Sequence, residues 1–129
     1  MIAYDKNQID DIWPYIERQV TRVLDLGSVY TLWQVYTELK NGNFHLWALP
    51  DAFCITAILR DPDKYCLIAI LQGRNMKDWL PYLSVIEEWA RVNDCTEVRV
   101  HGRRGWPRVL NYDSAGTDEQ GFCIARKKL

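Results

Sequence analysis

The sequence has no long apolar run, no marked excess of charge and no familiar catalytic motif. No stretch approaches the roughly 20 apolar residues that a membrane-spanning helix requires, and residues 1–6 lack the basic and apolar regions of a signal peptide. We therefore expect a cytoplasmic protein that makes no membrane contact. A net charge of −1 excludes a chain that binds nucleic acid through its overall charge. Phosphate-binding glycine loops, HExxH and GxSxG are also missing, so nothing indicates a hydrolase.

Closely spaced metal ligands are missing too. The four cysteines are separated by 12, 29 and 28 positions, so no two form a CxxC pair, and the two histidines lie far apart. We expect no metal site. The cysteines lie in apolar stretches and are predicted to be reduced core residues rather than a disulfide framework. They are Cys54, Cys66, Cys95 and Cys123.

The composition is that of one ordinary globular domain over residues 1–129. Hydrophobic residues make up 48% of the chain and charged residues 26%, which excludes disorder and fibrous structure. Charge is distributed unevenly: residues 1–98 carry 9 Lys or Arg and 14 Asp or Glu, whereas residues 99–129 carry 7 and 3. The C-terminal quarter is therefore basic on an otherwise acidic chain.

The hydrophobic periodicity predicts an α+β fold, a mixed sheet flanked by helices. Apolar residues at spacings of three and four predict a first helix over residues 9–24, capped by Asp10 or Asp11 and ended by Gly27. Continuous apolarity in two central strands predicts that both faces of the sheet are covered. The predicted strands are residues 2–4, 44–49, 52–60, 65–71, 95–101 and 122–128; the other predicted helices are residues 32–39 (stopped by Asn41-Gly42), 78–92 and 107–111, and residues 113–121 are a predicted polar loop.

This order of elements (β-α-α-β-β-β-α-β-α-β) resembles the GNAT superfamily of N-acetyltransferases over essentially the whole chain. The family usually closes with two strands, and the sequence indicates one. Residues 101–110, in which a glycine-arginine-glycine-tryptophan pattern leads into the short helix, look like small phage-encoded GNAT-like proteins. The resemblance implies an acyl-CoA-dependent N-acyltransferase acting on an amine, with acetyl-CoA as cofactor.

In that family the acyl-CoA pyrophosphate lies where the fourth strand gives way to the long helix, in a loop Arg/Gln-x-x-Gly-x-Gly/Ala. Gln72 matches the first position, whereas Asn75 and Lys77 stand where the glycines belong. Arg74 and Lys77 could contact phosphate through their side chains, but Asp78 as helix cap would occupy the N–H groups that a phosphate needs. The residues assigned to the cofactor are Leu71, Gln72, Gly73, Arg74, Asn75, Met76 and Lys77.

The resemblance also implies a tyrosine near the short helix that protonates the leaving thiolate. Tyr112 is the candidate, although it precedes the Gly121-Phe122 pair by nine positions, farther than in the family, and a packing role is the alternative. Glu97 is a candidate general base. It shares an outward strand face with Arg99 and His101, which could equally be a solvated row.

Two other roles compete with catalysis. The weak match to the phosphate loop favours a non-catalytic, phage-type GNAT-like protein that acts in binding or assembly. Some of the six tryptophans are predicted to be exposed, which suggests a protein partner or a homodimer. The basic segment 99–108 contains an aromatic residue and could bind single-stranded nucleic acid by charge and stacking, which is the less favoured alternative. It could also bind the phosphates of CoA or simply face water.

Overall fold

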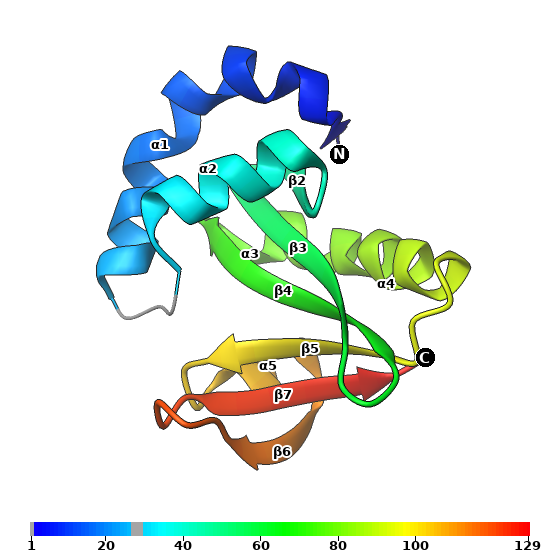
Figure 1. Ribbon diagram of the computed structural model, residues 1–129. Helices are drawn as coiled ribbons and strands as arrows, with labels where there is room; N and C mark the ends of the chain where they lie inside the picture. The colour runs from blue at the N-terminus through cyan, green and yellow to red at the C-terminus, as the bar shows by residue number, and fades with distance from the viewer. Residues whose placement is uncertain (1, 27–29) are drawn as a thin grey trace. The chain divides into compact units, whose positions relative to one another are not determined.

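The structure is a computed structural model that describes residues 2–26 and 30–129. It is α+β, and its strands form a mixed sheet with the order β1-β2-β3-β4-β5-β7-β6. Figure 1 shows the elements in chain order. They are β1 (Ile2–Tyr4), the 3₁₀ turn η1 (Lys6–Gln8), α1 (Ile9–Asp25), α2 (Leu32–Asn41), β2 (Phe44–Leu49), β3 (Ala52–Arg60), β4 (Lys64–Gly73), α3 (Met76–Trp79), the 3₁₀ turn η2 (Leu80–Tyr82), α4 (Leu83–Val92), β5 (Glu97–Gly102), α5 (Trp106–Leu110), β6 (Asp113–Thr117) and β7 (Cys123–Lys128).

The chain divides into two compact units, residues 1–56 with 70–79 and residues 57–69 with 80–129. Strands β3 and β4 each contribute residues to both units. None of the described helices has the length and apolarity needed to cross a bilayer.

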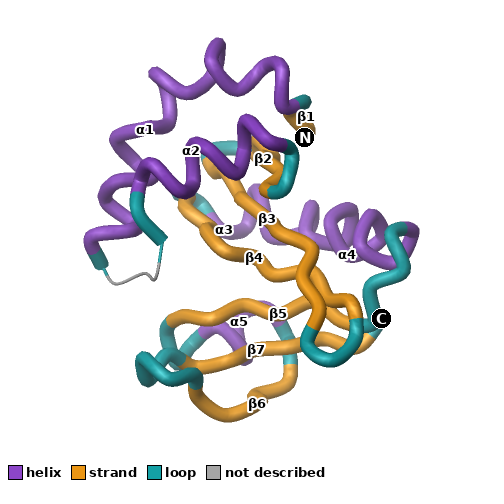
Figure 2. The backbone as a smooth tube through the Cα atoms, in the orientation of Figure 1, coloured by secondary structure: helices purple, strands orange, loops and turns teal. Residues whose placement is uncertain are grey.

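The first unit contains α1 and α2, which pack on each other, and α2 also contacts β2. Figure 2 shows the two helices running past the strands of this unit. Strand β1 pairs antiparallel with β2, with Ala3 opposite Trp47. Val20, Leu39 and Ile55 are fully buried, so apolar side chains of α1, α2 and β3 make up the core of this unit.

Helix α1 begins differently from the prediction. Asp5 is the residue that caps the first turn, because its carboxylate accepts from the Asn7 amide at 2.8 Å and Gln8 bonds back to the Asp5 amide at 2.8 Å. Asp10 and Asp11 lie inside the first turn of α1, and Pro14 falls within the helix. The preceding 3₁₀ turn therefore replaces the predicted cap. Gly27, the predicted stop, lies outside the described residues.

Helix α2 ends as predicted. Thr31 caps its N-terminus by accepting from the Gln34 amide at 3.1 Å, and Gly42 follows its last residue with φ +79°. Glycine reaches this left-handed conformation without a Cβ clash, so Asn41-Gly42 stops the helix as the sequence indicates.

The second unit has parallel and antiparallel pairs. Strand β4 pairs parallel with β5 over Tyr65 to Ile68, and β5 pairs antiparallel with β7. The predicted polar loop 113–121 was wrong in its first part, where β6 pairs antiparallel with β7. The predicted final strand is confirmed as β7. Two strands therefore follow α5, and the residues Asp-Ser-Ala-Gly-Thr gave no sign of the first because Asp, Ala and Gly are depleted in strands.

The predicted helix 78–92 is also divided. Residues 76–79 form α3, residues 80–82 a 3₁₀ turn and residues 83–92 helix α4. Pro81 lies in the 3₁₀ turn, where it has no N–H to continue the α-helical bonding. Asp78, the predicted cap, lies inside α3.

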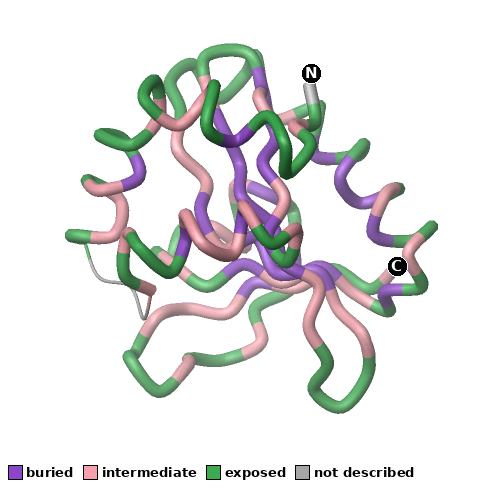
Figure 3. Tube along the Cα trace, turned by 45° about the horizontal axis from the view of Figure 1, so that its top comes forward, coloured by how far each residue is buried: buried purple, intermediate pink, exposed green. Residues whose placement is uncertain are grey.

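The central strands are buried on both faces, as their apolarity predicts. Phe53 to Ala57 are consecutively buried in β3, and Cys66 to Ile68 are consecutively buried in β4. Figure 3 shows this purple stretch of the trace. Cys54, Cys66 and Cys95 are buried and Cys123 is half-buried, in agreement with their prediction as core residues.

Candidate ligand-binding site

The segment assigned to the cofactor, residues 71–77, lies in the first unit. Leu71 and Gln72 are half-buried at the end of β4, whereas Gly73 to Lys77 are exposed. The segment is bound to the turn between β2 and β3: the Arg74 amide donates to the Asp51 carbonyl at 2.9 Å, and Asn75 Nδ2 donates to Asp51 Oδ2 at 3.3 Å. Asn75 has φ +51°, a conformation that asparagine tolerates better than most residues.

Gly73 is required by a close approach of two strands. A Cβ atom at this position would lie 2.3 Å from the Ala52 Cβ and 3.0 Å from the Trp79 Nε1. The indole N–H of Trp79 is buried and has no hydrogen-bond partner in the described part of the chain. Glycine therefore permits β4 to end tightly against β3.

The position of Asp78 removes one objection to an anion at this segment. Asp78 lies inside α3, and its own amide donates to the Asn75 carbonyl at 2.8 Å. The amides of Asn75, Met76 and Lys77 donate to no acceptor among the described residues. A carboxylate cap does not occupy them, contrary to the sequence prediction.

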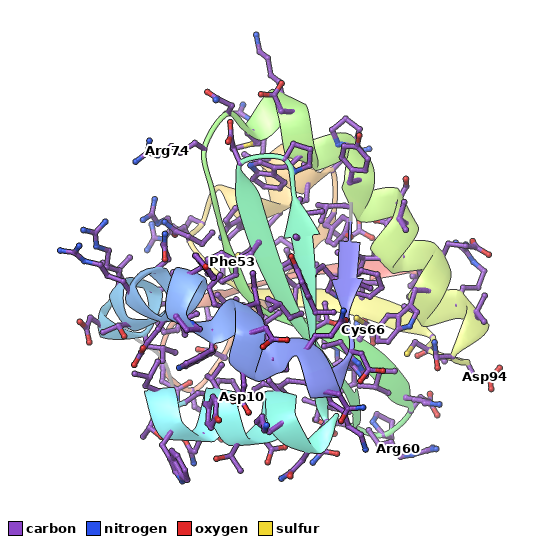
Figure 4. All side chains as sticks on the ribbon, turned by 90° about the horizontal axis from the view of Figure 1, so that it is seen from above. Asp10, Phe53, Arg60, Cys66, Arg74 and Asp94 are labelled. Atoms are coloured by element: carbon purple, nitrogen blue, oxygen red, sulfur yellow. The ribbon has the colours of Figure 1, made fainter. Side chains whose placement is uncertain are left out.

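A cavity of about 370 Å³ opens beside this segment, within the first unit. Its apolar lining residues are Ile12, Ile16, Leu46, Ala48, Ala52 and Phe53. Its other lining residues are Tyr4, Gln19, Arg22, Asp51, Gln72, Gly73 and Arg74. Figure 4 shows Arg74 at the outer edge of this unit and Phe53 within it. Of the segment assigned to the cofactor, Gln72, Gly73 and Arg74 thus line this cavity.

Arg22 and Arg74 reach the cavity from different elements, α1 and the segment after β4. Neither guanidinium forms an ion pair with a described residue. An arginine without an internal carboxylate partner is available to a carboxylate or phosphate of a ligand. Sequence reasoning missed Arg22 and Asp51, because only the fold brings positions 22, 51 and 74 to one cavity.

Tyr112 lies in the second unit, where it is buried. Its hydroxyl donates to Glu87 Oε2 at 2.6 Å, and Lys127 Nζ donates to Glu87 Oε1 at 3.0 Å. The tyrosine proton is thus directed at a carboxylate. Sequence reasoning missed Glu87, although a glutamate four residues after Leu83 falls on the apolar face of its helix and was a readable signal.

Glu97 also lies in the second unit and is bound by arginine. Its Oε1 accepts from Arg99 Nη2 at 2.9 Å, and Oε2 lies 4.0 Å from Arg126 Nε. The Arg99 guanidinium also stacks over the Tyr65 ring, 3.9 Å from its centroid. The side chains of Glu97 and Arg99 are 13% and 19% exposed, so this part of the row is a half-buried ion pair and not the solvated row that the sequence suggested.

The basic segment 99–108 presents charge but little aromatic surface. Arg103, Arg104 and Arg108 are exposed, whereas Trp106 is half-buried. A Cβ atom at Gly102 would lie 2.8 Å from the Trp106 ring, so the indole packs on the backbone of β5. Stacking of a base on this face of the ring would displace that contact.

Of the six tryptophans, Trp33 is the exposed one, at 72%. It lies on α2, and its ring centroid is 5.7 Å from that of Tyr36, which in turn lies 5.2 Å from Trp13. Among the tryptophans, Trp33 is therefore the one exposed enough to form the interface that the sequence suggested. The homodimer stays a prediction.

No protein-family model matches the chain, and no curated protein is detectably similar to it. In the described residues, no group of three or more His, Cys, Asp or Glu side chains is placed to hold a metal ion.

Proposed function

We propose that this chain is an acyl-CoA-dependent N-acyltransferase of the GNAT type, acting on an amine. One observation carries the proposal: the segment 73–77 is exposed throughout and holds Arg74, Lys77 and three amides without acceptors. Cationic side chains and free amides favour a phosphate group at the position where the resemblance puts the pyrophosphate of acyl-CoA.

The closing strands support the same proposal. The resemblance implies two strands after the short helix, and the structure has β6 and β7 there. The strand that carries the cofactor segment, β4, also runs parallel to β5, with the helical residues 76–92 between them in the chain.

The reaction needs little from the protein beyond positioning. The amine nitrogen forms a bond to the thioester carbonyl carbon, the C–S bond breaks, and the coenzyme leaves as a thiolate that takes up the proton lost by the amine. Holding the two reactants together can supply most of the acceleration of such a step. We therefore assign the segment 71–77 to holding the coenzyme.

Calorimetric titration with acetyl-CoA, with CoA and ADP as controls, tests the cofactor. We expect saturable binding of acetyl-CoA and CoA that Lys77→Glu weakens at least about tenfold, because a reversed charge repels the pyrophosphate. Lys128→Glu, a reversal of an exposed lysine on β7, should leave the affinity unchanged. No heat from any of the three ligands at millimolar concentration would contradict the proposal.

A second candidate is a GNAT-like protein that binds acyl-CoA without transferring the acyl group. The observation in its favour is that both proposed catalytic side chains are engaged inside the protein: Tyr112 with Glu87, and Glu97 with Arg99. Mass-spectrometric detection of acylated amine separates the two candidates. Transfer that is lost in Tyr112→Phe while acetyl-CoA still binds would assign Tyr112 to catalysis; binding without any product would favour the second candidate.

A further inference from the structure

The cavity of the first unit is lined by both apolar and charged residues. Its lining includes the apolar residues Ile12, Ile16 and Phe53 and the charged residues Arg22, Arg74 and Asp51. A ligand that fills it must therefore have an apolar body and a polar head. Its volume of about 370 Å³ is at the small end of ligand cavities, which suits a small metabolite better than a nucleotide.

The charges in the lining have opposite signs. Two guanidiniums without internal ion pairs can bind a carboxylate, because Arg donates two parallel hydrogen bonds to it. Asp51 also lines this cavity, and its Oδ2 accepts a hydrogen bond from Asn75 Nδ2 at 3.3 Å. A lining that contains one carboxylate and two guanidiniums is complementary to a ligand that carries both an anionic and a cationic group.

Among small molecules, an α-amino acid joins these three features on one carbon atom. We propose that this cavity binds a free α-amino acid with an apolar side chain. Arg22 and Arg74 hold the carboxylate, Asp51 holds the ammonium group, and the side chain lies against Ile12, Ile16 and Phe53. Arg74 also belongs to the segment assigned to the coenzyme under the proposed function, so the two ligands share this side chain. The amino-acid site does not rest on that assignment.

Three probes with the same apolar body test the recognition of each charge. They are L-leucine, 4-methylpentanoate, which lacks the ammonium group, and 3-methylbutylamine, which lacks the carboxylate. We expect L-leucine to bind to the full-length protein and each analogue to bind at least about tenfold more weakly, because each leaves a charged group of the wall unpaired. Binding is measured from the changes in the backbone amide chemical shifts of the protein, which also detect weak ligands. Equal affinity for either analogue, or no shift with any probe at tens of millimolar, would overturn the proposal.

Variants test whether Arg22 and Asp51 bind the ligand. Arg22→Gln and Asp51→Asn should each weaken L-leucine at least about tenfold. Asparagine suits the position of Asp51, which has φ +52°. Arg18→Gln is the matched control, because Arg18 lies on the same helix but does not line this cavity. Circular dichroism verifies that each variant is folded. Retention of wild-type affinity in both test variants would place the ligand elsewhere and overturn the assignment.

The two proposals fail separately. L-leucine is titrated without coenzyme, and acetyl-CoA is titrated without amino acid. Leucine binding without acetyl-CoA binding keeps the site and contradicts the proposed function. Acetyl-CoA binding without leucine binding overturns the inference and leaves the proposed function standing. If both ligands bind, L-leucine should weaken the binding of acetyl-CoA, because both use Arg74; independent binding would remove Arg74 from the amino-acid site.

Discussion

Gly73 is the residue on which the geometry of the site depends most directly. Its missing Cβ lets β4 end against Ala52, next to Gln72 and Arg74 in the cavity wall. Nothing in the residues around Gly73 reveals the contact with Ala52, because the two positions are 21 residues apart and meet only in the folded sheet. The exposure of the segment after β4 was readable from its run of polar residues, but its tight junction was not.

Gly73→Ala should destabilise the protein by about 1–3 kcal/mol, because the new methyl group would overlap the Ala52 side chain. Urea unfolding followed by circular dichroism gives the change in free energy of unfolding. Gly105→Ala is the control: a Cβ there meets nothing within 4 Å, and its φ of −75° suits alanine. A difference of less than about 0.5 kcal/mol between the two variants would mean that the close approach is absent.

Cys66 gives a prediction for alkaline solution. Burial, and secondarily the nearby Cys95 thiol, raises the pKa of Cys66 to about 12. In the unfolded chain a thiol loses its proton near pH 8.5, so between about 8.5 and 12 the unfolded state holds fewer protons than the folded state. The free energy of unfolding should therefore fall as pH rises through this window.

Unfolding in urea at several pH values between about 8.5 and 12 tests the predicted effect of Cys66 on the free energy of unfolding. Tyr and Lys side chains titrate in the same range, so the informative quantity is the difference in slope between wild type and Cys66→Ala. We expect a shallower fall in the variant, which has no thiol to ionise at that position. Parallel slopes would argue against a buried Cys66 thiol.

At the scale of elements, segments with a clear pattern of apolar residues were predicted correctly, whereas a strand of low strand propensity was not. The central strands and the stop of α2 at Gly42 were readable, because a short apolar run bounded by turn residues is typical of a buried strand and a glycine after a periodic segment is typical of a helix end. Strand β6 was not readable. All but one of its five residues are exposed, so its formation depends on pairing with β7 rather than on its own sequence.

The cap of α2 can be tested as an element. Thr31→Ala should destabilise the protein by about 1 kcal/mol, because the Gln34 amide loses its acceptor at the helix start. Thr21→Ala is the matched substitution inside α1, where the hydroxyl donates to the Glu17 carbonyl and alanine is the better helix former. Thermal unfolding should therefore show a lower midpoint for the first variant only. Equal midpoints would mean that the capping box contributes nothing measurable.

At the scale of the whole molecule, each unit is built from two separate stretches of the chain, and a stretch of the other unit lies between them. The first needs residues 70–79 as well as 1–56, and the second needs residues 57–69 as well as 80–129. The sequence predicted one domain and gave no sign of this division, because no linker rich in Gly, Pro or Ser separates the units.

A fragment of residues 80–129 should therefore be unfolded on its own, because it lacks the β4 residues that pair with β5. A fragment of residues 57–129 contains all of the second unit and is the comparison. Proton–nitrogen correlation spectra should show narrow amide dispersion for the shorter fragment and wide dispersion for the longer one. Wide dispersion for residues 80–129 alone would show that the second unit does not need the shared strands.

The shared strands also have a consequence during synthesis. The first unit has all its residues once position 79 has been added, whereas β5 is complete only at residue 102. At ordinary translation rates the 23 residues from 80 to 102 take about 1 to 5 s. During that interval the apolar stretch Cys66, Leu67 and Ile68 of β4 has no complete β5 to pair with on that edge. A nascent chain of this protein should therefore attract chaperones in that interval.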